Sequence, residues 1–478
     1  MSEMTAQKAE RRSNWTLAAL AAPCLPLAGL GLPLVVYLPE YYANELGLSL
    51  TAVGTAFMLV RLLDMAFDPY IGGVMDRTRS RFGRFKLWFA ISAPILMLAS
   101  YMLFMAKPGV SSLYLWIWLL VVYAGVSIAG LSQLAWAAVL SPQYDQRSRI
   151  YAWWQAGNVV GMIFVLTLPA LLPLLGVTGH GAGVQAMGWF IVILMPITVA
   201  LALWRVPEPK VTSEVRKSGF REYLALFKRP TVVRILVADL LIGTGPAITG
   251  ALFFFFFGRV KGFTHTEASL LLLIYFIGGL VGAPLWTWLS YKISKHKALA
   301  VSGIVYAGLT LCSLAIPQGA MLPAATLMFM IGVPYAAGAF LLRAMMADIG
   351  DEERLASGVD RTGLLYAILS GTVKVGSAAA VGISFPLLQF MGFDPKGQGV
   401  DTGLQGLAIL FAAVPAAMSI AASVIIWRFP LTSERHAEIR AALAARDMKE
   451  PGLAEAAPEM GSEPKITEEI HVATRPAE

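Results

Sequence analysis

Long apolar segments alternate with short polar segments along almost the whole chain. A helix needs about 20 predominantly apolar residues to cross a bilayer, and twelve segments between residues 15 and 427 have this character. We therefore expect an all-α membrane protein. The predicted membrane helices are residues 15–42, 50–72, 87–106, 112–139, 150–175, 185–205, 231–257, 267–290, 298–316, 321–347, 362–391 and 403–427.

The polar segments predict two groups of six helices. The longest internal polar stretch, residues 206–230, follows the sixth helix and separates a bundle at 15–205 from a second bundle at 231–430. A polar N-terminal segment, residues 1–14, precedes the first helix. The tail, residues 431–478, is also polar. We expect a short helix near its start and disorder in its Pro- and Glu-rich remainder.

The distribution of basic residues predicts the orientation in the membrane. Four loops on one side carry most of the loop lysines and arginines: 73–86, 140–149, 206–230 and 291–297. The alternate loops offer only Lys107, Arg259, Lys261 and Lys396. Basic loops stay in the cytoplasm, so we expect both termini to be cytoplasmic and the protein to lie in the cytoplasmic (inner) membrane.

Composition excludes several other classes of protein. The chain has 478 residues, of which 57% are hydrophobic and 14% are charged, whereas a soluble domain has about 25% charged residues. This excludes a soluble enzyme, a nucleic-acid-binding domain and a disordered protein. The net charge of +7 reflects the basic loops, so no nucleic-acid partner is expected. Cys24 and Cys312 lie in apolar segments, and we expect free, buried thiols with no structural metal.

The second predicted helix carries three charges that are expensive in a bilayer. Arg61, Asp64 and Asp68 are spaced i, i+3, i+7 and share one helix face. Each charge at the bilayer centre costs about 2.5–3.5 kcal/mol on insertion scales. Two carboxylates one turn apart can bind Na⁺ or share a proton, which predicts a cation site at Asp64 and Asp68. The alternative, an Arg61–Asp64 pair that only holds helices together, leaves Asp68 without a cation.

Two further charges lie in predicted helices of the second half. Lys374 needs an acidic partner, and Asp64 and Asp68 are the natural candidates. With Arg61, Lys374 would form a charge bridge that changes when a cation or solute binds. Asp239 in the seventh helix has two interpretations: a functional group, or a partner of Arg234 or another polar neighbour.

The loop after the second helix has its own pattern. Gly72-x-x-x-Asp76-Arg77 is followed by Gly83-Arg84. We interpret Asp76, Arg77 and Arg84 as a cytoplasmic latch in which Asp76 pairs with basic or helix-N-terminal groups. The alternative is that these arginines serve only as positive charges that set the topology.

These motifs resemble one transporter family. Arg61-x-x-Asp64-x-x-x-Asp68-Pro69, the Asp76–Lys86 loop and Lys374-Val-Gly-Ser377 are similar to the glycoside–pentoside–hexuronide:cation symporters of the major facilitator superfamily, which include the melibiose permease. The resemblance implies two six-helix halves around a central cavity and symport by alternating access. It assigns Asp64 and Asp68 to the cation and Lys374 to the bridge between sites.

The resemblance also implies the partners. We expect a small-molecule solute, a coupling cation and the lipid bilayer, with no cofactor beyond the ion and no enzymatic activity. By analogy with the fold alone, we expect a monomer.

The chain departs from this family at the solute site. Charged sugar-binding positions of the family fall near Ala28, Ser132 and Trp154, whereas Trp136 matches a pocket tryptophan. Two cargoes stay open: a glycoside-like or other small organic solute, and a lysolipid-like amphiphile. Trp153 and Trp154 could stack on a solute or anchor the helix. The candidate pocket residues are Ser132, Trp136, Trp153, Trp154 and Ser370.

Two neutral sodium ligands of the family are missing. Phe67 stands where sodium-using members carry an amide, and the hydroxyl position of the fourth helix falls near Ala129. Na⁺ needs several oxygens, whereas a proton needs one carboxylate. We therefore predict coupling to H⁺, with Na⁺ as the alternative.

Three further sequence patterns allow other interpretations or narrow the candidate chemistry. Asp64 and Asp68 could instead belong to a membrane prenyltransferase that holds Mg²⁺-diphosphate, but the second acidic cluster that such enzymes need has only a loop-end candidate at 348–353. Phe253–Phe257 is either apolar filler or an aromatic gate. All five histidines fall in predicted loops or the tail, so we expect none of them in a buried relay.

Overall fold

The chain folds into a bundle of long helices. The computed structural model describes residues 13–78, 80–140, 144–177, 181–208, 226–358, 361–395 and 403–449. Within these ranges, twelve helices are long and apolar enough to cross a membrane, and no strand occurs. The predicted all-α membrane fold with twelve spanning helices is therefore confirmed. The expected disorder beyond residue 449 lies outside the described residues.

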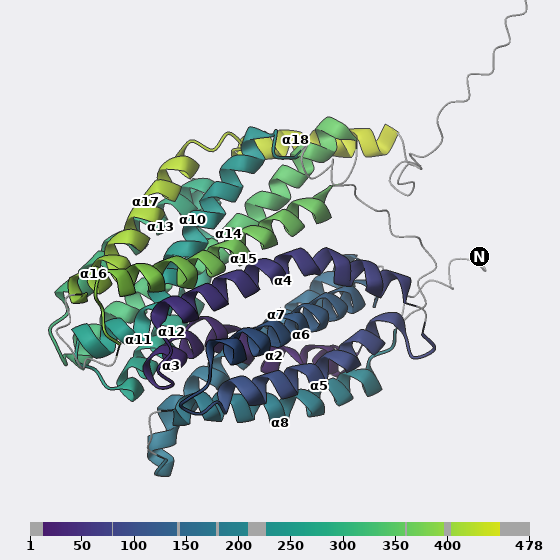
Figure 1. The fold of residues 1–478 in the computed structure, drawn as a ribbon. Helices are drawn as coiled ribbons and strands as arrows, with labels where there is room; N and C mark the ends of the chain where they lie inside the picture. The colour runs from purple at the N-terminus through teal and green to yellow at the C-terminus, as the bar shows by residue number, and fades with distance from the viewer. Residues whose placement is uncertain are drawn as a thin grey trace, which may run out of the picture.

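The N-terminal half occupies the lower part of the bundle in Figure 1. The predicted first helix is broken into three pieces, because Pro23 precedes the second piece and Pro33 lies inside it, and proline removes a backbone donor. The helices are α1 (Asn14–Ala21), α2 (Cys24–Val35), α3 (Tyr37–Asn44), α4 (Leu50–Arg77), α5 (Arg84–Phe104), α6 (Ser112–Val139), α7 (Tyr144–Leu171) and α8 (Ala182–Arg205).

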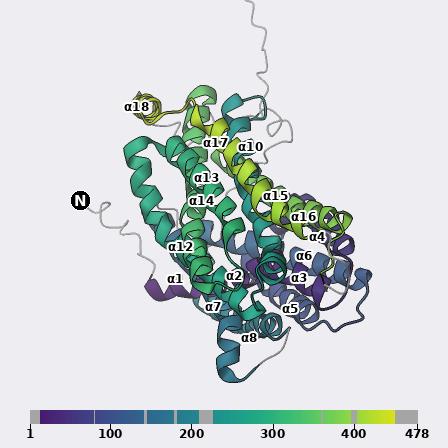
Figure 2. The ribbon, with the colours of Figure 1, turned by 90° about the vertical axis from the view of Figure 1, so that its left-hand side faces the viewer.

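The C-terminal half lies above it, and α4 and α15 run side by side at the boundary (Figure 1). Figure 2 shows α12, α13 and α14 next to one another. The helices are α10 (Pro230–Ala251), α11 (Phe253–Phe255), the π-helix Phe256–Val260, α12 (His265–Ile293), α13 (Lys295–Cys312), α14 (Met321–Ser357), α15 (Thr362–Phe390), α16 (Leu404–Ala408), the π-helix Ile409–Ala413, α17 (Val414–Trp427) and α18 (Ser433–Lys449).

Two elements extend past the predicted membrane spans at the end of the bundle where α4 ends and α5 begins. α14 continues to Ser357, because its last turns bury Ile349 and Glu353 against neighbouring helices. α18 packs on α14 and buries Ile439 and Leu443. We call this end of the bundle the terminal end and the opposite end the distal end.

The two halves contact each other at the distal end. The backbone N–H of Thr51 on α4 donates to Gln389 Oε1 on α15 at 2.7 Å. The ring of Tyr37 on α3 lies 4.7 Å from that of Phe254, centroid to centroid. All five phenylalanines of Phe253–Phe257 are buried, so this run fills the distal core and reaches the other half through Phe254.

The cysteine prediction is half right. Both cysteines are free, and Cys24 is buried, but Cys312 is exposed at the end of α13. The prediction fails at Cys312 because an apolar segment of a membrane helix need not face protein, since lipid tails are equally apolar.

Small residues allow α12 and α14 to pack closely. A Cβ added at Gly282 of α12 would lie 2.2 Å from the carbonyl oxygen of Val333, and one at Gly332 of α14 would lie 1.9 Å from that of Tyr275. Neither backbone oxygen can move away cheaply. This close approach of backbones is typical of helix pairs in membranes.

We predict that Gly282→Ala lowers stability by about 1–3 kcal/mol, the usual cost of overpacking. Gly308→Ala on α13 is the matched control, because a Cβ there would meet nothing within 4 Å. The measurement is the thermal unfolding midpoint of the purified full-length chain in detergent. Equal midpoints for the two variants would contradict the packing argument.

Candidate cation site and central cavity

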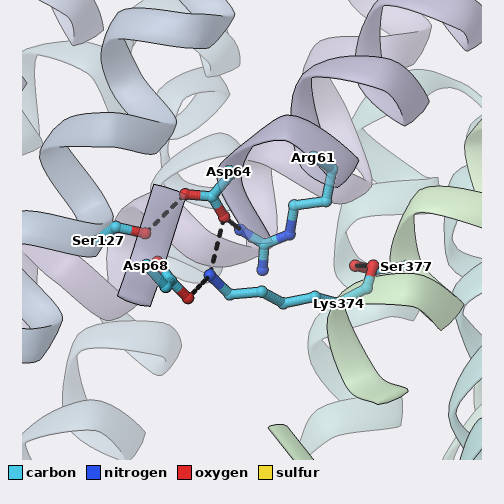
Figure 3. A network of polar contacts seen from close by, with 6 residues as sticks. All are labelled: Arg61, Asp64, Asp68, Ser127, Lys374 and Ser377. Carbon is cyan, nitrogen blue, oxygen red and sulfur yellow. Dashed lines mark hydrogen bonds and ion pairs between the residues drawn. The ribbon is translucent and has the colours of Figure 1, made fainter. Parts of the chain in front are cut away.

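The predicted charges on α4 lie together and face Lys374 of α15 (Figure 3). Asp64 is buried, with 2% of its surface exposed. Its Oδ2 accepts a hydrogen bond from Arg61 Nη1 at 3.1 Å. The guanidinium of Arg61 also lies 4.7 Å from the ring centroid of Tyr123 on α6, which holds this side chain against its own half.

Lys374 of α15 reaches across the boundary between the halves. Its Nζ lies 2.9 Å from Asp64 Oδ2 and also pairs with Asp68 Oδ2. The structure therefore brings together the four residues that the sequence singled out on different halves. Two carboxylates face two cations, so the cluster of Arg61, Asp64, Asp68 and Lys374 is neutral overall.

Sequence reasoning missed a hydroxyl at this site. Ser127 Oγ on α6 donates to Asp64 Oδ1 at 2.6 Å, so both oxygens of Asp64 have partners. The family position near Ala129 suggested that the fourth membrane helix offered no hydroxyl here. The serine two residues earlier in a strongly apolar run was the signal that could have revealed it.

Asp68 keeps one open acceptor. Its Oδ1 is buried and has no hydrogen-bond partner among the described residues, although 26% of the side chain is exposed. A buried acceptor without a partner costs free energy. A proton or a small cation is the species that this oxygen could take.

Next to this cluster lies a central cavity of about 550 Å³, lined by α2, α7, α10–α15, the π-helix Ile409–Ala413 and α17. Its lining is mostly apolar and aromatic. The charged side chains in the lining are Asp239 and Arg343. Asp239 accepts a hydrogen bond from Thr372 Oγ1 of α15. The interpretation that Asp239 pairs with a polar neighbour is therefore right, but the neighbour is Thr372, whereas Arg234 Nη1 donates to the carbonyl of Arg428.

None of the five predicted pocket residues lines this cavity. Trp136 is buried, and its Nε1 donates to the carbonyl of Pro207 at 3.0 Å. Ser132 bonds its own helix at Ile128. The indole of Trp154 contacts Gln133, and Trp153 and Ser370 are exposed. Homologous position gave helices that line the cavity for Trp153, Trp154 and Ser370, on α7 and α15, but α6, which carries Ser132 and Trp136, contributes no lining residue.

The structure describes only part of the predicted latch. Arg77 is exposed at the end of α4, and Arg84 begins α5, whereas the side chain of Asp76 lies outside the described part of the chain. Another carboxylate occupies the helix N-terminus. Glu208 accepts the backbone N–H groups of Arg84, Phe85 and Lys86 at 2.7, 3.0 and 2.9 Å.

This cap stabilises the start of α5, because the first amides of a helix lack internal partners and carry partial positive charge. Gly83 makes the approach possible: its φ is +103°, and a Cβ would collide with the Glu208 carboxylate at 2.3 Å. The sequence showed Glu208 only as one acid between two prolines after the sixth membrane helix.

The histidine prediction needs a correction at the distal end. His265 is the first residue of α12, and its Nε2 lies 3.2 Å from Glu40 Oε2 of α3. Glu40 is 4% exposed and also accepts from Asn44 Nδ2. The His265 ring stacks on Phe254 at 4.3 Å. This polar contact joins the two halves, and it was missed because Glu40 and His265 both lie at predicted helix ends.

Comparison with known proteins identifies the family. A family model described as MFS/sugar transport protein matches residues 19–433. The chain belongs to this family. It is 22% identical over 417 residues to the glucuronide carrier protein homolog of Escherichia coli K12, covering 84% of this chain and 90% of that one. It is 23% identical to the isoprimeverose transporter of Lactiplantibacillus pentosus, covering 79% and 81%.

Solved structures agree on the fold. A mutant of the nucleoside transporter NupG superimposes with a TM-score of 0.65 at 14% identity, covering 86% of this chain and all of that one. A bacterial homologue of the lysosomal transporter Spinster, inward-facing and unoccupied, gives 0.60 at 16% identity, covering 91% and 98%. The chain is thus an integral membrane protein of a transporter family, which excludes the prenyltransferase alternative.

We predict that Lys374→Met destabilises the protein by about 1–3 kcal/mol, because it leaves Asp68, a partly buried carboxylate, without its cation, whereas Asp64 keeps Arg61. Adding Asp68→Asn restores the charge balance, so the double variant should unfold at a higher temperature than Lys374→Met alone. Lys297→Met is the control, since Lys297 is exposed at the start of α13. Thermal unfolding of the purified variants measures this, and a double variant no more stable than the single one would refute the charge balance.

Proposed function

We propose that this protein is a secondary active symporter that couples H⁺ movement to the uptake of a glycoside-like small solute. The observation that carries the proposal is the Lys374 amine, held between Asp64 and Asp68 of the other half. The relatives named as carriers and symporters for glucuronides, isoprimeverose and glycosides support the cargo class.

The coupling follows from charge competition. In this structure, Lys374 occupies both carboxylates and ties α15 to α4. A proton on Asp68 neutralises one partner of Lys374 and weakens the tie between the halves. Because Asp68 Oδ1 is an open acceptor, it is the oxygen that we assign to the proton. The halves can then move relative to each other around a central solute, as alternating access requires.

The donor set favours H⁺ over Na⁺. Ser127 supplies one neutral oxygen near Asp64, but Arg61 and Lys374 already occupy Asp64 Oδ2. Na⁺ would have to displace a cation and collect several oxygens. A proton needs only one carboxylate oxygen.

We assign the terminal end to the cytoplasm, because the basic segments that join α4 to α5 and α12 to α13 lie there. Contacts between the halves at the distal end, through Thr51–Gln389 and Glu40–His265, then support an inward-facing state. We further propose that the transporter works as a monomer, since each chain contains both halves and the cavity between them.

We predict that a pH gradient, acidic outside, drives solute accumulation in vesicles and that a Na⁺ gradient at clamped pH does not. Asp68→Asn should abolish accumulation but keep solute counterflow, because exchange without net transport needs no ion movement. Arg234→Gln, on a side chain outside the cavity, is the control and should behave like the wild type. Accumulation driven by Na⁺ alone would overturn proton coupling.

A further inference from the structure

The central cavity contains a guanidinium without a carboxylate partner. Arg343 of α14 lines the cavity and is exposed to it. Its side chain donates to the backbone carbonyl of Ala339, one turn earlier. No carboxylate of the described residues lies within ion-pair distance of it. Asp239 of the same lining attracts Arg343 from beyond ion-pair distance, and the exposed guanidinium keeps donors that can bind an anion brought from outside.

Asp239 of α10 is the second charged group of the lining. It is 7% exposed. Thr372 Oγ1 donates to Oδ2, and no hydrogen bond reaches Oδ1 from the part of the chain that the structure describes. A carboxylate with a free oxygen accepts hydroxyl donors well.

Two hydroxyls on α13 complete the polar surface. Tyr306 OH and Thr310 Oγ1 are one helix turn apart, line the same cavity and are buried. Within the described residues neither meets strict hydrogen-bond geometry with a partner, although Tyr306 OH lies near the hydroxyls of Thr249, Tyr275 and Thr310. Buried hydroxyls that lack partners are uncommon in proteins, and both would be satisfied by a polyhydroxyl ligand.

The opposite wall of the cavity is much less polar. α2 contributes Ala28, Gly31 and apolar side chains, and α7 contributes Gln155 and Asn158 as its polar groups. Among the described lining residues, those that could recognise a solute by charge therefore all belong to the C-terminal half.

We propose that Arg343, Asp239, Tyr306 and Thr310 form the solute-recognition subsite, and that its ligand is a hydroxylated carboxylate. The carboxylate binds the planar fork of Arg343, whose geometry matches it in a bidentate way. The hydroxyls bind Asp239, Tyr306 and Thr310. A neutral sugar satisfies the hydroxyl partners but leaves the guanidinium unpaired, and an amphiphile leaves the hydroxyls unpaired. This assignment rests on the proposed transport function.

The test compares pairs of ligands in which one member has a carboxylate where the other has a hydroxymethyl group. Binding of methyl β-D-glucuronide and methyl β-D-glucoside, and of galacturonate and galactose, is measured by calorimetry on the purified full-length protein at one pH. We expect each carboxylate to bind about tenfold or more tightly than its neutral match. Arg343→Gln should remove that preference and change the affinity for the neutral ligands by no more than about twofold. Arg234→Gln, a basic residue of the same half outside the cavity, should retain it.

Several outcomes overturn the subsite: equal affinity for charged and neutral ligands, a preference that survives Arg343→Gln, no binding of any carboxylate, or tighter binding of a lysolipid than of every carboxylate. Asp239→Asn adds a separate readout, since it should weaken the binding of both members of each pair together.

Because binding is measured without an ion gradient, failure of proton-driven uptake would refute the proposed symport and leave this subsite standing. Equal affinities would refute the subsite and leave symport standing.

Discussion

One ammonium group between two carboxylates joins the halves of this protein at the centre of the bundle. Lys374 comes from α15, and Asp64 and Asp68 come from α4, more than 300 residues earlier in the chain. Each of these charges alone would be expensive in a membrane. Together they are tolerated, and their pairing makes the contact between α4 and α15 depend on charge as well as on packing.

This dependence distinguishes the centre of the bundle from its distal end. At the distal end, the halves are held by apolar contacts and by polar contacts such as Glu40–His265 and Thr51–Gln389. At the centre, under the proposed proton coupling, a single proton weakens the contact, because the cluster is neutral only while both carboxylates are ionised. A rocking motion around the cavity requires that central contact to be breakable, and a charge-balanced cluster provides this without loosening the helix packing.

The sequence predicted the charge cluster because an ionised side chain in a bilayer must be paired with an opposite charge or be hydrated. Asp64, Asp68 and Lys374 therefore had to lie close together or in contact with water. It predicted twelve helices because the length of an apolar run is sufficient evidence for a span. The sequence did not predict which face of each helix points into the cavity. Trp136 and Ser132 were placed in the pocket by homologous position, yet Trp136 donates to Pro207 and Ser132 to its own helix.

The missed residues share a cause. Ser127, Glu208 and His265 are ordinary polar residues whose importance lies in a partner far along the chain: Asp64, the amides that begin α5, and Glu40. No local pattern marks such a pair. A charge in lipid is an anomaly that a single sequence can reveal, whereas a serine or histidine at the right distance becomes visible only in three dimensions.

α15 places the two polar sites within two residues of each other. Thr372 donates to Asp239 in the cavity, and Lys374 donates to Asp64 and Asp68. Under the proposed coupling, a ligand that competes with Thr372 for Asp239 and a proton that competes with Lys374 for Asp68 act on the same turn of the same helix. Coupling between solute and ion then needs no long pathway of contacts, because one rigid element has both sites on it and its position relative to α4 depends on the occupancy of each.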